Sequence, residues 1–249
     1  MTAFPSHPWT THGRRLESAV RKALFEFNLL DGVSRLGIAL SGGKDSLTML
    51  LLLHAISGRG LPPFELVGLH IANAEKPISP LVESLCNHLS IPLHVESMSY
   101  THNDCYSCSR ERRCLLFSLA KKVDCSTIAF GHHRDDNAQT LLMNLLHKAE
   151  FAGLLPKITL HTYGVSIIRP LIHLAEKDIV TFVKQYGLAG STCQCAFGHL
   201  RLRKKTDKLL EMIEELYPHA RSNLAQAALN FGSKKAQEVP KGFVSEAID

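Results

Sequence analysis

Hydrophobic and polar positions along the chain follow two alternating periods. Apolar residues three or four positions apart predict an N-terminal helix over residues 14–30. Short apolar runs bounded by glycine, proline or polar residues then predict buried strands, and a helical stretch follows each of them. The expected strands are 35–40, 65–71, 92–96, 126–130 and 165–168, and the expected helices between and after them are 46–56, 80–89, 112–123, 136–147 and 175–186.

This alternation predicts an α/β fold in which helices cover both faces of a parallel sheet. After position 195 the strand pattern stops, and residues 205–216 and 220–231 are expected to form two C-terminal helices. The predicted organisation is an N-terminal helical arm (1–30), an α/β domain (31–195) and a C-terminal basic helical extension (196–249). A chain of 249 residues can bury a core of this kind without disulfides.

The charge of the chain changes this picture only where it is clustered. A net charge of +5 favours a polyanionic partner weakly. One basic cluster alone is usually a solvated helix face, but several clusters beside a candidate active site favour nucleic acid. The clusters are Arg14, Arg15, Arg21 and Lys22; Arg110, Arg112 and Arg113; and Arg201, Arg203, Lys204 and Lys205.

The location of the protein is inferred from what its sequence lacks. The first twelve residues contain no apolar segment of the signal-peptide type, and the longest apolar run, 47–53, is too short to span a membrane. We therefore expect a cytoplasmic protein with no membrane partner. In a reducing compartment the seven cysteines are expected to be thiols or metal ligands, not disulfides.

The stretch S41-G-G-K-D-S46 lies between a predicted strand and a predicted helix. In that position backbone N–H groups can bind phosphate at the helix N-terminus, because glycine allows an anion to approach closely. The stretch lacks the spacing of a Walker A loop. Asp45 would repel phosphate unless a Mg²⁺ ion joined the two, so we expect Mg²⁺ here. The plainer alternative is a tight Gly-Gly turn with a solvated Lys-Asp pair.

A second polar stretch, G131-H-H-R-D-D136, follows the strand predicted at 126–130. Ligands of α/β proteins bind at the carboxyl ends of parallel strands, so this stretch is a further candidate for the nucleotide site. Asp135 could instead be the helix N-cap, with Asp136 favoured by the helix dipole. The two roles are compatible.

The cysteines by themselves leave several chemistries open. Cys105 and Cys108 form a C-x-x-C pair that suits zinc, an iron–sulfur cluster or thiol redox chemistry, or that has no function. Redox chemistry of the thioredoxin type is disfavoured because the pair is not expected to open a helix directly after a strand. Cys193 and Cys195 follow far downstream with a C-x-C spacing that matches zinc sites poorly.

Taken together, these motifs resemble a known family. S41-G-G-K-D-S46 resembles the PP-loop of the N-type ATP pyrophosphatases. Four more motifs follow this loop: C105-Y-S-C108, G131-H-H-R-D-D136, I168-R-P-L171 and E176-K-D-I179. The order and spacing of all five resemble the tRNA 2-thiocytidine synthetase family over roughly residues 12–230. The resemblance implies a Rossmann-like fold of the adenine nucleotide alpha hydrolase type, and cleavage of ATP to AMP and pyrophosphate. It also implies nucleotide contacts from Ser41 to Ser46 and from His132, Asp135 and Asp136.

The resemblance further implies a [4Fe–4S] cluster held by Cys105, Cys108 and Cys193, with one iron left open to bind sulfide. The chain departs from the family pattern in two places. It has C-Q-C where the family has C-x-x-C, which leaves Cys195 as an alternative ligand, and L69-H-I-A-N73 lacks an acidic residue of the family. Cys86, Cys114 and Cys125 are expected to be bystanders.

The sequence therefore predicts an ATP-dependent tRNA sulfurtransferase that adenylates a cytidine of the anticodon loop and replaces its C2 oxygen with sulfur. Lys44 and Asp45 are expected to be catalytic with the cysteines, and Asp45 to hold Mg²⁺. The basic residues of the last two clusters are expected to bind the tRNA backbone. The expected partners are tRNA, a sulfur donor (a cysteine desulfurase or sulfide) and a second copy of the chain. The alternatives are a PP-loop enzyme that forms C–N bonds without a cluster, such as an amide ligase or a lysidine-type tRNA enzyme, and an inactive nucleotide- or RNA-binding homologue.

Overall fold

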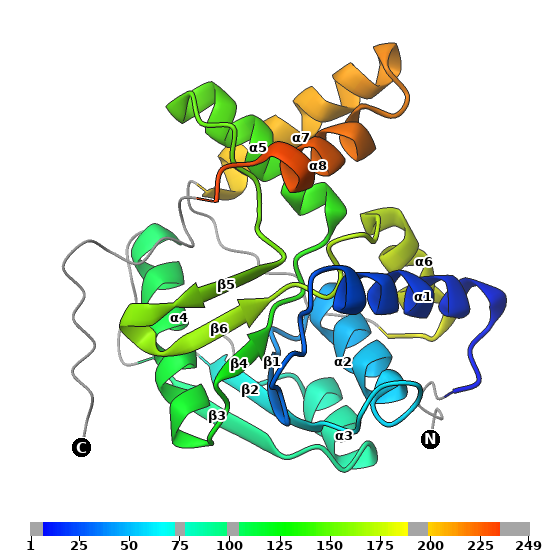
Figure 1. The fold of residues 1–249 in the computed structure, drawn as a ribbon, viewed down its shortest axis with the longest axis vertical. Helices are drawn as coiled ribbons and strands as arrows, with labels where there is room; N and C mark the ends of the chain where they lie inside the picture. The colour runs from blue at the N-terminus through cyan, green and yellow to red at the C-terminus, as the bar shows by residue number, and fades with distance from the viewer. Residues whose placement is uncertain (1–6, 73–77, 99–104, 189–198, 235–249) are drawn as a thin grey trace.

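The fold is built on a sheet of six strands in the part of the chain that the computed structural model describes, residues 7–72, 78–98, 105–188 and 199–234 (Figure 1). The strand order is β3-β2-β1-β4-β6-β5. The strands are β1 (Arg35–Ala39), β2 (Glu65–Ala72), β3 (Leu93–Ser97), β4 (Thr127–Ala129), β5 (Lys157–Leu160) and β6 (Val165–Ile168). The helices are α1 (Thr11–Glu26), α2 (Lys44–Ile56), α3 (Pro80–His88), α4 (Cys105–Lys122), α5 (Arg134–Lys148), α6 (Glu176–Gln185), α7 (His199–Leu216) and α8 (Ala220–Phe231), with a 3₁₀ turn at His161–Tyr163.

The predicted α/β class is confirmed, but the expected parallel sheet is wrong at one edge. Strand β5 was missed, and it pairs antiparallel with β6 through the register Ile158↔Ile167. Its four residues are at most half-buried and carry no run of apolar side chains, so the sequence gives only a weak strand signal there. The connection is tight, and Gly164 takes the positive φ of 59° that such a turn needs.

Two layers of apolar side chains lie on the two faces of the sheet. Alternate residues of β2 separate them: Leu66 belongs to the core formed with α1, α2, α3 and α6, whereas Val67 and Leu69 belong to the core formed with α4. Helix α2 is enclosed almost on all sides, because α1 and α6 cover the face that points away from the sheet. This enclosure fixes α2 in place, and the glycine-rich loop lies at the N-terminus of this helix.

Several helix boundaries differ from those expected. Helix α4 begins at Cys105 and not at residue 112, and α7 begins at His199 and not at residue 205. The few apolar residues in the added segments show no helical spacing, so apolar periodicity does not detect these turns. Helix α1 runs from Thr11, capped by the Thr10 side chain, to Glu26, which corrects the range 14–30 at both ends.

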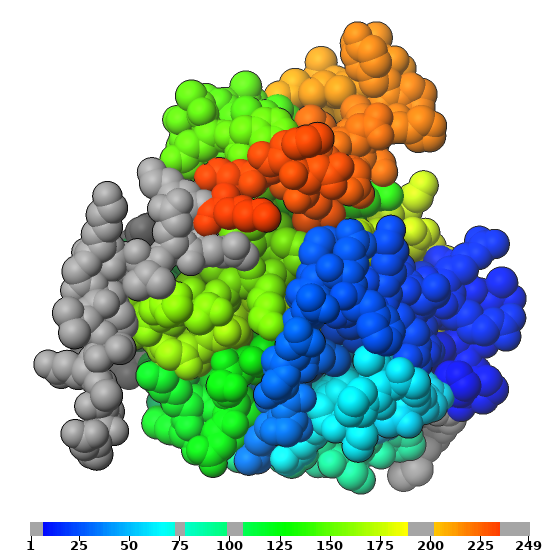
Figure 2. All heavy atoms as spheres, viewed as in Figure 1, coloured from blue at the N-terminus to red at the C-terminus, as the bar shows by residue number. Residues whose placement is uncertain are grey.

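Helices α5, α7 and α8 stand together beyond the sheet, at the top of the view (Figure 1). The Asn137 side chain joins them to the rest of the chain: its amide donates to the Ala225 carbonyl at 3.2 Å, and its carbonyl accepts from the Leu154 N–H at 2.6 Å. Figure 2 shows the atoms of α8 packed beside those of α5 above the α1 surface. Among the described helices, none is long and apolar enough to cross a membrane. The division into three segments stays a prediction.

Candidate active site

The two glycine-containing motifs meet where the strand order reverses. From β1 the chain adds β2 and β3 on one side and then β4 on the other, so the loops after β1 and β4 lie beside one another at the carboxyl edge. A Cβ atom on Gly131 would lie 3.2 Å from the Asp45 carbonyl carbon and 3.2 Å from the Ser46 nitrogen. Gly131 is therefore glycine because the second motif rests directly on the first.

The loop from Ser41 to Ser46 has the conformation of an anion site. Gly42 takes a φ of 77°, which favours glycine, and Gly43 is the N-cap of α2 with no side chain hydrogen-bonded to the first turn. Ser46 Oγ donates to the Gly43 carbonyl at 2.9 Å, and Ser41 Oγ accepts from the Gly43 N–H at 3.2 Å. The helix N-terminus thus keeps uncapped N–H groups that an incoming phosphate can accept from.

Lys44 is placed between two carboxylates. Its Nζ lies 3.2 Å from Asp45 Oδ2 and 2.9 Å from Glu176 Oε1. Burial lowers the pKa of Lys44, but the hydrogen bond to Glu176 and the charge of Asp45 outweigh it, so the pKa lies above its usual value. Lys44 is therefore a permanent cation. Glu176 is the first residue of α6. It lies in the motif E176-K-D-I179, but the sequence alone assigned it no role.

Asp45 has the properties expected of a cation ligand. Burial raises the pKa of its carboxyl group, against the opposing effects of His133 and Lys44. Its Oδ1 atom is buried and accepts no hydrogen bond, so the oxygen lacks the partner that a buried carboxylate normally needs. A hard divalent ion would supply that partner, since Mg²⁺ binds one or two carboxylates together with waters and substrate phosphates. The donor set therefore fits Mg²⁺.

The start of α5 corrects the expected capping. His133 is the N-cap: its Nδ1 accepts from the Asp136 N–H at 3.4 Å, and Asp136 Oδ2 accepts from the His133 N–H at 3.1 Å. Asp135, for which a capping role was the alternative, instead accepts from the N–H of Glu176 at the start of α6. It also lies 3.7 Å from the Arg221 guanidinium. Asp135 thus joins three helices and is buried.

Asp136 lines the cavity beside the loop, as Asp135 does. Its Oδ1 lies 3.6 Å from the Arg203 guanidinium. Burial alone would raise the pKa of Asp136, yet the imidazoles beside it outweigh this and hold the pKa below its usual value. Asp136 is therefore ionised at neutral pH and available to a cation.

His132 lies apart from the other predicted nucleotide residues. Its ring stacks on Phe130 with centroids 5.8 Å apart, and Arg169 Nε donates to its Nδ1 at 3.4 Å. Burial, followed by the charge of Arg169, lowers the pKa of His132 to about 4, so the ring is neutral. His132 is not among the residues that line the pocket beside the loop.

A cavity of about 220 Å³ lies beside the loop, and its wall is almost entirely charged or polar. It receives residues from the loop, from α5 and α6, and from the C-terminal helices. The lining residues are Lys44, Asp45, His133, Asp135, Asp136, Gln139, Glu176, Arg203, Lys204, Asp207 and Arg221. Sequence reasoning missed the contribution of α7 and α8, because nothing local to those helices indicates the loop that they approach.

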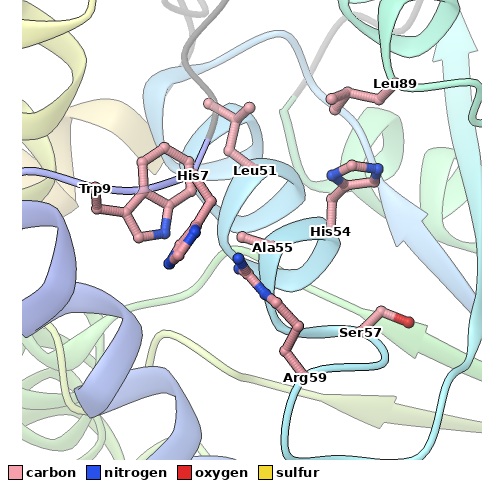
Figure 3. A pocket seen from close by; sticks show the side chains of 8 residues that line it. All are labelled: His7, Trp9, Leu51, His54, Ala55, Ser57, Arg59 and Leu89. Atoms are coloured by element: carbon pink, nitrogen blue, oxygen red, sulfur yellow. The ribbon is translucent and has the colours of Figure 1, made fainter.

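A second cavity, of about 260 Å³, lies at the other end of α2 (Figure 3). Figure 3 shows His54 on the last turns of the helix, with Trp9 and His7 of the N-terminal segment on one side and Arg59 below. No residue predicted for catalysis, nucleotide or metal lines it. The wall is mainly aromatic and aliphatic, and the other lining residues are Leu51, Ala55, Ser57 and Leu89.

The cysteines are divided between described and undescribed parts of the chain. Cys108 lies in the first turn of α4, partly buried and reduced. The pair opens helix α4, but β3 ends at Ser97 and α4 begins at Cys105, so the pair does not open a helix directly after a strand. The Cys105 side chain and all of Cys193 and Cys195 lie outside the described residues. Within the described part, no group of three side chains could hold a metal ion.

The remaining cysteines behave as packing thiols. Cys86 and Cys125 are buried, and burial raises the pKa of Cys86 to about 11, so it stays protonated. Burial also raises the pKa of Cys125. Cys114 is only partly buried, and its Sγ lies 3.4 Å from the Tyr163 hydroxyl.

The basic residues expected to contact RNA lie on α4 and α7. Arg110 and Arg113 are exposed on α4, whereas Arg112 is partly buried. Lys205 is exposed on α7, and the Arg201 side chain lies outside the described residues. Arg203 and Lys204 line the cavity beside the loop.

The segment 69–73 at the end of β2, which lacks the acidic residue of the family, is joined to the end of β1 by His70. The His70 Nδ1–H donates to the Leu40 carbonyl at 2.6 Å, directly before the phosphate loop. Burial lowers the pKa of His70, so the ring is a neutral donor. This hydrogen bond helps to fix the end of β1. Asn73 lies outside the described residues.

Comparison with known proteins agrees with this geometry. A family model described as a PP-loop domain matches residues 12–190. A tRNA-cytidine(32) 2-sulfurtransferase from Pelobacter propionicus is 31% identical over 230 residues, covering 87% of this chain and 86% of that protein. One from Syntrophotalea carbinolica is 28% identical over 250 residues, covering 95% and 96%.

Among solved structures, the U34-tRNA thiolase NcsA from Methanococcus maripaludis, determined with its [4Fe–4S] cluster, superposes with a TM-score of 0.72. It is 22% identical in sequence, and the match covers 92% of this chain and 86% of that one. At this identity the match shows the fold. The predicted PP-loop, Rossmann-like architecture is thereby confirmed.

Proposed function

Because this chain belongs to the PP-loop family and, within it, to the tRNA-cytidine(32) 2-sulfurtransferases, we propose that it adenylates a cytidine of the tRNA anticodon loop and replaces the C2 oxygen with sulfur. The observation that carries this proposal is the meeting of the two glycine motifs at the switch point of the sheet, which forms a charged cavity on the α2 N-terminus. ATP-dependent tRNA thiolation is favoured over C–N bond formation by the family relatives and by the thiolase fold.

The nucleotide step uses the loop and the residues that face it. The uncapped N–H groups of α2 bind phosphate oxygens, and Lys44 neutralises the charge that develops on the leaving pyrophosphate. The C2 oxygen of the cytidine attacks the α-phosphorus of ATP, which forms a P–O bond and expels pyrophosphate. A sulfur nucleophile then forms the C2–S bond and expels AMP, which carries away the original oxygen.

Two carboxylates are proposed to hold Mg²⁺. Asp45 has a buried oxygen without a hydrogen-bond donor, and Asp136 is ionised and faces the same cavity. A bound Mg²⁺ would supply charge neutralisation between these carboxylates and the phosphates of ATP. In this arrangement Asp135 positions the start of α6, and with it Glu176, and does not touch the nucleotide.

Cys105, Cys108 and Cys193 are proposed to hold a [4Fe–4S] cluster, with Cys195 as the alternative third ligand. Support comes from the position of the C-x-x-C pair in the first turn of α4, where Cys108 is reduced and only partly buried, so its thiol can act as a ligand. A cluster with three protein ligands would supply an iron that can carry sulfide to the activated base. Sulfide or a cysteine desulfurase is the proposed source.

The RNA is proposed to lie across the arginines of α4 and the basic start of α7. The exposed residues Arg110 and Arg113 on α4 favour phosphate contacts, with Arg112 between them in sequence; on α7, Arg201 and Lys205 are proposed to do the same. The target base must leave its stack to reach the cavity, and a single-stranded loop makes that inexpensive. We place this reaction in the cytoplasm.

Exposed apolar residues on one side of α7 support a homodimer. Leu209, Met212 and Leu216 follow one another at helical spacing and are 37%, 62% and 76% exposed. A second copy of the chain would cover them. Light scattering of the wild type and of Met212→Glu tests this: a dimer that the substitution converts to monomer supports the contact, and a monomeric wild type contradicts it.

The reaction is tested with purified protein, ATP, Mg²⁺, sulfide and unmodified tRNA. Mass spectrometry of the digested tRNA should show 2-thiocytidine, and AMP and pyrophosphate should appear only when tRNA is present. A C–N ligase would release AMP and pyrophosphate without thiolated nucleoside, and an inactive homologue would release neither. Either outcome overturns the proposal.

The cluster is tested by anaerobic reconstitution with iron and sulfide. A broad brown absorbance should form and should be lost in Cys105→Ser and Cys108→Ser, whereas Cys114→Ser, on the same helix, should keep it. Comparing Cys193→Ser with Cys195→Ser identifies the third ligand. Stoichiometric zinc with no iron would contradict the cluster.

A further inference from the structure

The part of the cavity wall that belongs to the PP-loop domain is negatively charged. It contributes one cation, Lys44, which is already paired with carboxylates. The same part of the wall contributes four carboxylates to the cavity: Asp45, Asp135, Asp136 and Glu176. A nucleoside polyphosphate is itself strongly anionic, so such a wall would repel it at short range. Even with Mg²⁺ bound, further cations are needed.

The C-terminal helices supply those cations from outside the PP-loop domain, whose family model ends at residue 190. Helices α7 and α8 add Arg203, Lys204 and Arg221 to the wall, against the single carboxylate of Asp207. They therefore offset most of the negative charge that the PP-loop part of the wall carries.

Of these cations, Arg221 is already committed to protein partners. Its guanidinium lies 2.6 Å from Asp207 Oδ1 and 3.1 Å from Glu214 Oε2, and its side chain is 12% exposed. Together with its ion pair to Asp135, it fixes α8 and α7 against α5. Arg221 is thus a positioning residue.

Arg203 is different, because its main chain is fixed while its head group is accessible. Gln139 Nε2 donates to the Arg203 carbonyl at 2.9 Å, which anchors the first turns of α7 on α5. The guanidinium lies 3.6 Å from Asp136 Oδ1, too far for a good hydrogen bond, and the side chain is 46% exposed. A planar guanidinium held in this way is suited to two parallel hydrogen bonds with a phosphate group.

We propose that Arg203, with Lys204 beside it, binds the polyphosphate of ATP and is a nucleotide ligand, not an RNA contact. The proposal rests on the proposed function, since it assigns residues to the nucleotide of that reaction. Lys205, the next residue along α7, is exposed and is not among the residues lining the cavity, so it stays on the proposed RNA surface. The basic run of α7 is therefore divided between two ligands.

The experiment compares Arg203→Ala with Lys205→Ala, two neighbouring truncations on one helix. Calorimetry measures binding of a non-hydrolysable ATP analogue with Mg²⁺ in the absence of tRNA. Filter binding measures tRNA affinity without nucleotide over a range of salt concentrations. Arg203→Ala should weaken the ATP analogue at least about tenfold and leave tRNA affinity within about twofold. Lys205→Ala should do the reverse, and lower the salt slope of tRNA binding by about one.

A folding control separates a binding role from a structural one. The Tm of ligand-free Arg203→Ala should match that of the wild type, while the rise in Tm on adding the ATP analogue should be smaller. Arg203→Lys should recover part of the affinity for the ATP analogue, because lysine keeps the charge but lacks the planar pair of N–H donors of arginine.

Two results would overturn the proposal: an unchanged affinity of Arg203→Ala for the ATP analogue, or a loss of tRNA affinity without a loss of nucleotide affinity. Failure of the proposed function itself is recognised separately. In that case the wild-type protein would form no thiolated nucleoside, whether or not the ATP analogue binds in an Arg203-dependent manner.

Discussion

The two ends of helix α2 carry cavities of similar size and opposite character. At its start, about 220 Å³ is lined by carboxylates, cations and a buried oxygen without a donor. Toward its end, about 260 Å³ is lined mainly by aromatic and aliphatic side chains, with Trp9 only 3% exposed. Both ends hold a buried polar atom without a hydrogen bond, Asp45 Oδ1 at the first and Trp9 Nε1 at the second. The ends therefore differ in charge at the first and in packed aromatic rings at the second, which contribute to stability. We therefore expect chemistry to depend on the first end and folding on the second.

The largest expected effect separates the two ends by activity. Lys44→Ala removes the cation that stabilises charge on the leaving pyrophosphate, so thiolation of tRNA should fall by about 10²- to 10³-fold. His54→Ala, on the last turns of the same helix, should stay within about twofold of the wild type. The measurement is the initial rate of 2-thiocytidine formation by mass spectrometry. Equal losses in both variants would remove the functional contrast between the ends.

The second-largest expected effect is on stability, and it comes from the second end of α2. Trp9 packs edge-on against Phe182 and Tyr186, with ring centroids 5.5 Å and 5.8 Å away. Trp9→Ala should therefore lower the free energy of unfolding by about 3 kcal/mol, because it leaves a cavity between α1, α2 and α6. Urea unfolding measures this. Phe25→Ala is the matched control, since Phe25 is 59% exposed on α1 and its truncation should change stability by about 0.5 kcal/mol or less.

Acid should also distinguish two histidines, His132 after β4 and His54 on the last turns of α2. Burial lowers the pKa of His132 to about 4 in the folded protein, against about 6.5 when unfolded. As the pH falls from 6.5 to 4, the unfolded chain takes up a proton that the folded chain refuses, so stability is lost across that window. The loss should approach roughly 3 kcal/mol.

Urea unfolding at several pH values measures this loss, and His132→Gln should flatten the profile. Burial also lowers the pKa of His54 on the last turns of α2, although this residue is exposed. His54→Gln should therefore flatten the profile less. A steeper dependence on His54 than on His132 would contradict the contrast.

The smallest effect concerns the metal. Asp45→Asn keeps the shape of the side chain but removes the charge offered to Mg²⁺, so the Mg²⁺ concentration for half-maximal AMP release should rise about tenfold. Asp31→Asn, an exposed carboxylate outside the cavity, should leave it unchanged. The measurement is a Mg²⁺ titration at fixed ATP and tRNA. An unchanged midpoint in Asp45→Asn would assign the metal to other groups.

Much of the fold and half of the site could be read from the sequence, because those features have local causes. Alternating periods identify five strands and most helices, and Gly42 identifies the loop because its backbone takes a positive φ that favours glycine. Strand β5 escaped because its alternation extends over only four residues, and the first turns of α4 and α7 escaped because their few apolar residues show no helical spacing.

Only the tertiary structure decided which distant residues meet at the loop. The cap of α5 proved to be His133, while Asp135 was drawn to the start of α6 and to Arg221. Glu176 contacts Lys44, and Arg203 lines the cavity beside the loop, from a helix that had been expected to serve RNA alone. These contacts depend on how α5, α6, α7 and α8 pack against one another. Packing is a property of the whole core, so no local pattern in the sequence can specify it.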